Sequence, residues 1–181
     1  MTPPPHKTRI KDLNRMTAGE FVRTVGHVFE NSPWVAERAF EAHPFEGITD
    51  LHEKMVAAVT SASEAEQLAL IRAHPDLVGR MAAQAAQPAQ HLTPESRREQ
   101  AAAGLDRLSA DEVEAFRTYN AAYHRQFSFP FVICARENKK DAILAAFPQR
   151  LRNSREQEMA AALAEIAKIA RLRLLDIIEE H

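Results

Sequence analysis

The sequence predicts an all-α fold: a single compact domain of several helices, with a long C-terminal helix and one buried extended segment, FPFVICA. Two observations favour helices. Signatures of helix N-termini recur along the chain, and the apolar residues between them are spaced by three or four positions, as on one face of an α-helix. A third observation argues against a sheet, because only one stretch has the aromatic and β-branched composition typical of a strand.

The start of each expected helix is marked by its first residues. A hydroxyl residue followed three positions later by Glu or Gln forms a capping box, in which the two side chains satisfy backbone N–H groups of the first turn. Proline at the first helical position loses an N–H that has no intrahelical partner anyway. Capping boxes are expected at Thr17, Ser63, Ser109 and Ser154, proline starts at Ser32-Pro33 and Thr93-Pro94, and a simple cap at Thr49.

Apolar spacing supports the same helices. Phe21, Val25, Val28 and Phe29 are expected on one face of the first, and Leu51, Met55 and Val59 on one face of the third. The last helix is expected from about residue 155 to 180. FSFPFVICA, at 127–135, has a strand-like composition, but nothing else in the chain offers it a partner, so it is expected to be extended and buried without a sheet. MAAQAAQPAQH, at 81–91, is expected to be a helix end and a loop.

Composition limits the organisation of the chain to one domain. With 181 residues, 45% hydrophobic and 27% charged, it suits one globular domain, expected over residues 8–181. Residues 1–7 are expected to form a flexible arm, because the prolines of TPPPHK lack N–H groups and restrict the residues before them.

Charge and cysteine content limit the partners. A formal net charge of -2 gives no basic surface for nucleic acid, and no apolar run is long enough for a membrane span or a signal sequence. The single cysteine, Cys134, cannot form an internal disulfide. We therefore expect a cytoplasmic protein that binds neither nucleic acid nor membrane.

Three features break the helical pattern and are candidate site residues. The first is His74, which stands where an amphipathic helix stops. Pro75 prevents the helix from continuing, so the imidazole is presented at a sharp stop, where it could exchange protons near neutral pH. The alternative is a histidine that caps the carbonyl groups of the helix end.

The second feature lies in LTPESRREQ, at 92–100. Ser96, Glu99 and Gln100 are three or four positions apart on the first turns of a helix, so they could line one wall of a pocket. The N–H groups of a helix N-terminus favour an anionic or carbonyl-rich ligand. The alternative is a set of polar residues that water solvates.

The third feature is Arg173, which falls on the apolar face of the last helix. That face is formed by Met159, Leu163, Ile166, Ala170 and Ile177. A buried guanidinium costs several kcal/mol unless a carboxylate or an anionic ligand meets it. Either a structural ion pair, an extension of the side chain to water, or a bound anion would explain Arg173.

Other common chemistries lack support in the sequence. HEKMV, at 52–56, has valine where a zinc-protease helix needs its second histidine, so no metal is expected. Neither glycine-rich nucleotide motif occurs. Cys134 lies in an apolar run and is expected to be a small core residue rather than a nucleophile.

Four separated motifs together resemble one family, the 2-oxo-4-hydroxy-4-carboxy-5-ureidoimidazoline (OHCU) decarboxylases of urate degradation. The motifs are HPDLVGR, LTPESRREQAAAGLDRLSADE, FPFVICARENKK and EIAKIARLRLLD, in that order over almost the whole chain. The resemblance implies an all-α fold, no cofactor, a possible homodimer, and the conversion of OHCU into (S)-allantoin with loss of carbon dioxide.

The resemblance also implies roles for particular residues. The histidine of HPDL is the catalytic acid/base, which is His74, with Glu99 and Arg173 as the other catalytic residues. The residues implied to bind substrate are Pro75, Ser96, Arg97, Arg98, Glu99, Gln100, and the main chain of Phe131, Val132, Ile133, Cys134 and Ala135.

Two other functions stay open on the sequence alone. One is a related all-α enzyme that acts on another ureide or imidazolone. The other is a non-enzymatic helical interaction module, in which Arg173 and Glu99 form a buried structural pair. Turnover of a panel of substrates would distinguish the first, and the stability of apolar replacements the second.

Overall fold

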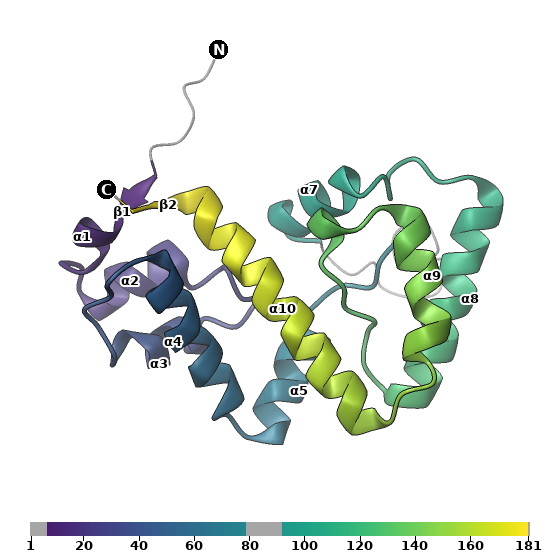
Figure 1. The fold of residues 1–181 in the computed structure, drawn as a ribbon, viewed down its shortest axis with the longest axis horizontal. Coiled ribbons are helices and arrows are strands. Elements are labelled where there is room, and N and C mark those ends of the chain that lie inside the picture. Colours follow the sequence, from purple (N-terminus) through teal and green to yellow (C-terminus); the bar gives the residue numbers. More distant parts are fainter. Residues whose placement is uncertain (1–6, 79–91, 181) are drawn as a thin grey trace, which may run out of the picture. The chain divides into compact units, whose positions relative to one another are not determined.

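A computed structural model describes residues 7–78 and 92–180, and in this part of the chain the fold is almost entirely helical (Figure 1), as predicted. The α-helices are α1 (Ile10–Leu13), α2 (Ala18–Val25), α3 (Trp34–Phe40), α4 (Ile48–Thr60), α5 (Glu64–Arg72), α7 (Pro94–Ala102), α8 (Ala110–Phe127), α9 (Lys140–Arg150) and α10 (Arg155–Ile177). A 3-10 turn, η1 (Ala135–Glu137), and two short strands, β1 (Thr8–Arg9) and β2 (Ile178–Glu179), complete the described elements. The predicted loop at 81–91 lies outside them.

The capping signals in the sequence locate most helix starts correctly. Reciprocal hydrogen bonds form the four predicted capping boxes, which begin at Thr17, Ser63, Ser109 and Ser154. Thr93 also caps α7, with Pro94 in the first turn. These contacts join residues three apart, so local sequence is sufficient to specify them.

Three predicted boundaries are wrong. α4 begins at Ile48 rather than after a Thr49 cap, and the Glu180 carboxylate accepts the Ile48 N–H at 3.1 Å. α2 ends at Val25, so the buried Val28 and Phe29 follow the helix instead of belonging to it. Pro33 precedes α3 as its N-cap residue rather than occupying its first position.

The last helix is shorter than predicted, because α10 ends at Ile177 and the chain then pairs as a strand. Thr8 and Arg9 of β1 lie opposite Ile178 and Glu179 of β2 in a parallel pair (Figure 1). Lys7, the one residue of the expected arm that is described, donates from Nζ to the Leu175 carbonyl oxygen at 2.6 Å. The composition of this segment did not predict a strand, since each strand has only two residues.

Contacts within the chain define two compact units. The first unit contains residues 1–70 and 167–181, and the second contains residues 71–166. Helices α5 and α10 each begin in one unit and end in the other. The expectation of one domain stays a prediction, and each unit is described by itself.

The first unit has an aromatic core between short helices. α3 packs against α2 and α4. Phe21 is fully buried on α2, and its ring lies 5.3 Å from that of Phe40 and 5.4 Å from that of Phe45, measured between centroids. Leu51 and Met55, predicted on the apolar face of α4, are also fully buried.

The second unit is built around the predicted extended segment. No residue between Ser128 and Cys134 is helical or in a strand, and Phe129 and Phe131 are buried, as predicted. Tyr123 of α8 meets the Phe131 ring edge-on at 5.3 Å, while Phe147 of α9 stacks on Phe131 at 3.9 Å. Aromatic side chains from α8 and α9 thus replace the strand neighbours that the segment lacks.

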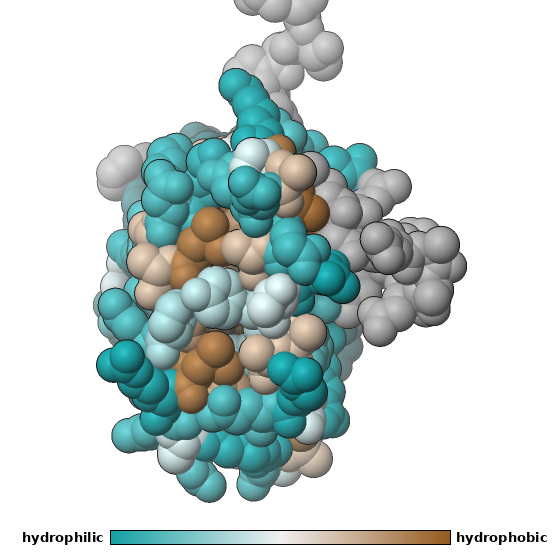
Figure 2. Space-filling model, turned by 90° about the vertical axis from the view of Figure 1, so that its right-hand side faces the viewer, coloured by the Kyte–Doolittle hydropathy of each residue, from teal (hydrophilic) through white to brown (hydrophobic). Residues whose placement is uncertain are grey.

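No helix in the described ranges is long and apolar enough to cross a membrane. Figure 2 looks onto the side that carries α8, where hydrophobic residues form separate spots among hydrophilic ones. Leu175 is the one large hydrophobic residue that is exposed in residues 7–78 and 92–180.

Candidate functional site

The HPDL segment follows α5 and is anchored on both sides. Only 5% of His74 is exposed, and its N–H donates to the Ile71 carbonyl oxygen at 3.1 Å, in a final turn beyond Arg72. The Arg72 guanidinium donates from Nε to the Ser128 carbonyl oxygen at 3.1 Å. The helix ends before Pro75, as predicted, and the structure adds that His74 is buried.

The residues after His74 are bound by α8. Asn120 donates from Nδ2 to the Leu77 carbonyl oxygen at 2.9 Å, and the His124 ring lies with Nε2 2.7 Å from Asp76 Oδ1. The hydrogen bond to Asp76 raises the pKa of His124 above its ordinary value. The imidazolium form of His124 is thus favoured beside the aspartate, and the pair fixes Asp76 in place.

The first turns of α7 carry the second group of predicted residues. Ser96 is buried and its N–H donates to Thr93 Oγ1 at 3.2 Å, whereas Arg97 and Arg98 are exposed. Gln100 is half-buried and accepts the Val78 N–H on Oε1 at 3.3 Å. The structure thus brings one predicted residue of α7 into contact with the chain directly after HPDL.

The third predicted group, Phe131 to Ala135, lies beside α7 through η1, which packs against that helix. Several of its main-chain groups already have protein partners. The Val132 carbonyl oxygen accepts from Arg150 Nη1 at 2.5 Å, the Cys134 N–H donates to Glu165 Oε2 at 2.8 Å, and the Cys134 carbonyl oxygen accepts from Asn138 Nδ2 at 2.9 Å. A substrate bound by these groups has to share or replace these hydrogen bonds.

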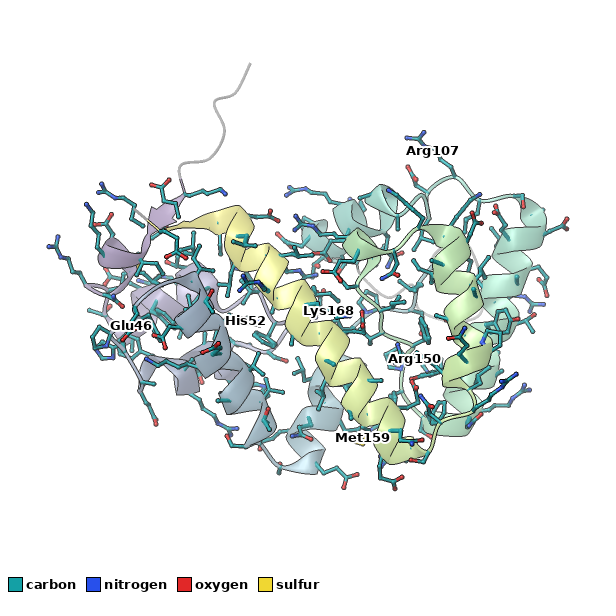
Figure 3. The ribbon with its side chains drawn as sticks, viewed as in Figure 1. Glu46, His52, Arg107, Arg150, Met159 and Lys168 are labelled. Atoms are coloured by element: carbon teal, nitrogen blue, oxygen red, sulfur yellow. The ribbon has the colours of Figure 1, made fainter. Side chains whose placement is uncertain are left out.

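A buried network that the sequence analysis missed supports the extended segment. Glu158 is completely buried and accepts hydrogen bonds from Arg150 Nε, Asn153 Nδ2 and the Tyr123 hydroxyl. Arg150 Nη2 also lies 2.8 Å from a Glu158 oxygen as an ion-pair contact, and the guanidinium stands 4.5 Å from the Phe131 ring centroid. Figure 3 shows Arg150 projecting from α9 within the second unit.

The signal for this network was present but ambiguous. Burial, together with the hydrogen bond to Glu158, raises the pKa of the Tyr123 hydroxyl, so Tyr123 remains a donor. Glu158 stands directly beside Met159 at the beginning of α10, where the sequence reads as a solvated first turn. Only its partners on α8 and α9 show that it is buried.

Arg173 lies in the first unit, where its predicted burial is confirmed. It is 4% exposed, and Nη1 donates to Glu30 Oε2 at 2.8 Å and to the Val28 carbonyl oxygen at 3.4 Å. Arg171, two positions earlier, is exposed. The partner of the Arg173 guanidinium is Glu30, which the sequence did not mark as a site residue. The one hint of its burial in the sequence is its position directly after the apolar Val28 and Phe29.

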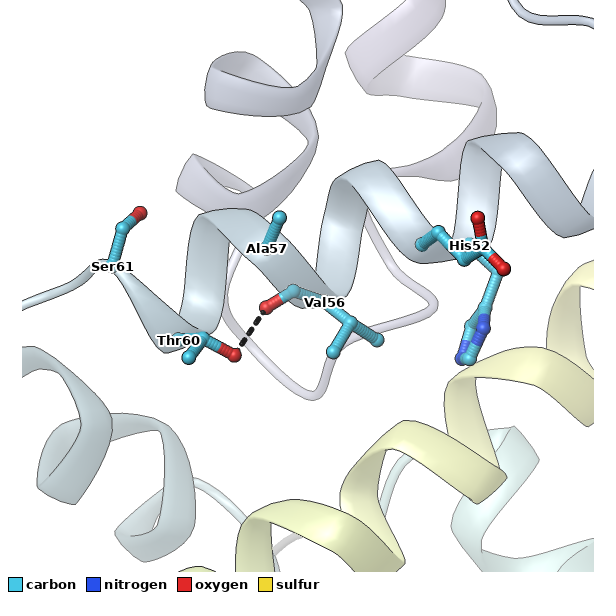
Figure 4. A pocket seen from close by; sticks show the side chains of 6 residues that line it. His52, Val56, Ala57, Thr60 and Ser61 are labelled. Atoms are coloured by element: carbon cyan, nitrogen blue, oxygen red, sulfur yellow. Dashed lines mark hydrogen bonds between the residues drawn. The ribbon is translucent and has the colours of Figure 1, made fainter.

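A surface pocket of about 520 Å³ lies elsewhere in the first unit (Figure 4). It is lined by His52, Glu53, Val56, Ala57, Thr60 and Ser61, all on α4 or at its end. His52 is held by the Ala167 carbonyl oxygen, 2.8 Å from Nε2, and Thr60 donates to the Val56 carbonyl oxygen of its own helix. None of the predicted site residues lines this pocket, and its polar groups do not converge on one point as a catalytic site requires.

The described residues form neither a metal-binding cluster nor a reactive thiol. No group of three or more His, Cys, Asp or Glu side chains there could hold a metal ion. Cys134 is fully buried, and burial raises the pKa of its thiol. The prediction that Cys134 is a core residue rather than a nucleophile is therefore supported.

Comparison with known proteins places the chain in a family. The model of the family described as OHCU decarboxylase matches residues 14–175. The chain belongs to the OHCU decarboxylase family. The matched range includes all the predicted site residues, from His74 to Arg173, so the resemblance seen in the four motifs extends through the chain.

Relatives in this family are similar over nearly their full length. The OHCU decarboxylase of Haloferax volcanii is 40% identical over 94% of this chain and 96% of its own. That of Amia calva is 41% identical over 94% of both chains. A crystal structure of (S)-allantoin synthase superimposes with a TM-score of 0.72 and 30% identity, over 95% of this chain and 54% of that one.

Proposed function

We propose that this OHCU decarboxylase family member converts OHCU into (S)-allantoin and carbon dioxide in the degradation of urate. The observation that carries the proposal is the family match over residues 14–175. Relatives named for this activity, about 40% identical over at least nine-tenths of both chains, support it. The enzyme is then a carbon–carbon lyase, and its substrate is a small anion.

The bonds that break and form in this reaction define what the protein has to provide. The bond between a ring carbon and the carboxylate breaks, carbon dioxide leaves, and the adjacent C=N group of the ring takes up the electron pair. The nitrogen of that group takes a proton, and the hydroxyl on the carbon that lost the carboxylate gives up its proton to become a carbonyl. A proton is then added on one face of the neighbouring carbon, which carries the ureido group, and this addition sets the configuration of the product. The protein has to orient the carboxylate, stabilise the charge that develops and deliver the proton.

His74 is proposed as the acid/base that exchanges a proton with the substrate. Its burial and its fixed turn support this role, because proton transfer requires a constant distance between the ring and the reacting atom. Glu99, half-buried on α7, is proposed to bind a substrate nitrogen or to orient the imidazole. Pro75 is proposed to lie beside the substrate.

The remaining predicted residues are proposed to bind the substrate. Arg173 would hold anionic or carbonyl oxygens, since a guanidinium offers several donors in a fixed plane. The main chain from Phe131 to Ala135 would bind the ureido group or the ring amide, and Ser96, Arg97, Arg98 and Gln100 would contribute from α7. Gln100 can do so while its Oε1 holds the Val78 N–H, because its amide nitrogen is a separate donor. A cytoplasmic location and a homodimer stay predictions.

The test is an optical assay with OHCU generated in situ. Urate oxidase and hydroxyisourate hydrolase produce OHCU from urate, and circular dichroism then follows optically active allantoin after this protein is added. Spontaneous decay gives racemic allantoin, so only enzymatic turnover leaves an allantoin signal after the substrate is consumed. Faster growth of the (S)-allantoin signal is expected, and a folded sample that gives neither acceleration nor optical activity would refute the proposal.

The same assay tests the role of His74. His74→Ala removes the acid/base, so turnover is expected to fall by roughly 10² to 10⁴ while the far-ultraviolet spectrum stays that of a folded helical protein. His52→Ala is a suitable control, because His52 is a half-buried imidazole on α4 that is bound to a main-chain carbonyl and is not a predicted site residue. Turnover equal to wild type in folded His74→Ala would contradict the role.

A further inference from the structure

The HPDL segment is held by two side chains of one helix. Asn120 and His124 are four positions apart on α8, so they lie on the same face of that helix. Asn120 binds the Leu77 carbonyl oxygen at 2.9 Å, and His124 binds the Asp76 carboxylate at 2.7 Å. One turn of α8 is therefore hydrogen-bonded to two consecutive residues, Asp76 and Leu77, which directly follow His74 and Pro75.

The ends of the segment are tied down as well. Before it, Arg72 donates to the carbonyl oxygen of Ser128, the residue that caps the C-terminus of α8. After it, Val78 adopts a left-handed backbone with φ of 62° and donates its N–H to Gln100. A β-branched residue in that region is strained, and it persists only where surrounding contacts hold it. The path of the chain on either side of His74 is thus fixed by contacts, not by local preference.

The second polar atom of Asn120 indicates why an amide is present there. Asn120 is 8% exposed, and its Oδ1 is buried without a hydrogen-bond partner in the part of the chain that the structure describes. An unsatisfied buried acceptor costs about 1–3 kcal/mol, a cost that an apolar residue of similar size would avoid. The bond from Nδ2 to Leu77 offsets only part of it. Asn120 is therefore better explained by what it holds than by the stability it contributes.

We propose that Asn120 and His124 are positioning residues that fix the orientation of His74 by holding the backbone and Asp76 next to it. The inference rests on the acid/base role proposed for His74. Neither residue has to touch the substrate, because each acts through the HPDL segment. A displacement of about 1 Å at a reacting group can cost as much as a hundredfold in rate, so loss of either contact should lower the rate of the chemical step rather than substrate binding.

Four variants test the proposal in the optical assay. Asn120→Leu and His124→Ala each remove one contact, and kcat is expected to fall about tenfold or more with KM within about twofold of wild type. His124→Gln keeps an amide donor for Asp76 and should retain most of the lost kcat. Gln126→Leu is the matched control: Gln126 is on the same helix and its amide also donates to a main-chain carbonyl at 2.9 Å, but to Leu151. Its kcat should equal that of wild type.

A measurement without turnover separates the inference from the proposed function. The ring resonances of His74 are identified by their absence in the nuclear magnetic resonance spectrum of His74→Ala. In Asn120→Leu and His124→Ala they are expected to shift or broaden, and in Gln126→Leu to stay in place. If wild type does not act on OHCU, the proposed function fails, but these spectra still decide whether the two residues position His74.

The proposal is overturned if kcat and the His74 resonances are unchanged in folded Asn120→Leu and His124→Ala, even where their melting temperatures fall. Such a result would make the contacts structural only. If Asn120→Leu does not fold, His124→Ala decides alone, because the His124 side chain is 39% exposed and its removal leaves no large cavity.

Discussion

Each of the two units pairs an arginine with a buried glutamate, but the surroundings of the two pairs differ. Arg173 is itself buried, whereas the Arg150 side chain is 13% exposed. In the second unit, Glu158 accepts hydrogen bonds from three side chains, and Arg150 also holds a carbonyl oxygen of the extended segment. In the first unit, Arg173 donates from Nη1 to Glu30 at 2.8 Å and, over a longer distance of 3.4 Å, to the Val28 carbonyl oxygen. Only Arg173 matches a residue that the family resemblance assigns to the site.

The comparison shows that a buried ion pair alone does not mark a functional site. Two charges in a core are costly unless further hydrogen bonds satisfy them. The Glu158 carboxylate is satisfied by three side chains, whereas Arg150 Nη2 has an ion-pair contact but no hydrogen bond within the described residues. Through Arg150, the network holds the Val132 carbonyl oxygen and contacts the Phe131 ring of the extended segment. Arg173 is singled out by the sequence motif, so the two pairs should respond differently when one or both charges are removed.

The largest expected effect is on stability, from Glu158→Leu. This change leaves the half-buried Arg150 without its carboxylate and the buried Tyr123 hydroxyl without its acceptor. The free energy of unfolding should fall by about 3 kcal/mol, the lower end of the range for breaking a buried pair, because Arg150 keeps some contact with water. Urea denaturation followed by circular dichroism measures it. Glu114→Leu, which removes the exposed partner of Arg117, should leave the midpoint unchanged. Equal effects of the two changes on the denaturation midpoint would show that the network around Glu158 does not stabilise the fold.

The second expected effect is on turnover without loss of stability, at the pair of Arg173 and Glu30. Replacing both members, Arg173→Met with Glu30→Leu, removes two buried charges together and should keep the free energy of unfolding near wild type or raise it. Turnover should nevertheless fall by about 10² to 10³, the usual cost of losing one preorganised donor to a developing charge. Turnover at the wild-type level in this double variant would place Arg173 with Arg150, as a purely structural cation.

The smallest effect comes from a pair that is not buried, His124 with Asp76. Because the folded-state pKa of His124 is raised above 6.5, the imidazolium stabilises the fold fully below pH 6.5, and this stabilisation is lost as the pH rises through the raised pKa. The contribution should be below about 1 kcal/mol, since solvent screens a partly exposed pair. The difference in melting temperature between wild type and His124→Gln should therefore shrink from about pH 5.5 to about pH 9. A constant difference would mean that the charge of His124 does not matter.

Elements whose causes are local could be predicted from the order of the residues. Capping boxes placed four helix starts, because each joins residues three apart, and the helical period placed Arg173 in the core. The composition of FPFVICA was enough to predict an extended, buried segment, because no second strand was available to it. Pro75 was enough to predict that the helix before it ends at or before His74.

Pairings between distant residues could be known only from the folded chain. Glu30 answers Arg173 from 143 positions away, and Glu180 accepts the first N–H of α4 from 132 positions away, which is why a local cap at Thr49 was the wrong expectation. Glu158 and Asn120 were missed for the same reason, since a polar residue in a helix looks solvated until the neighbouring elements enclose it. Secondary structure follows from interactions between near neighbours, whereas the burial and partner of a polar side chain depend on which elements pack around it.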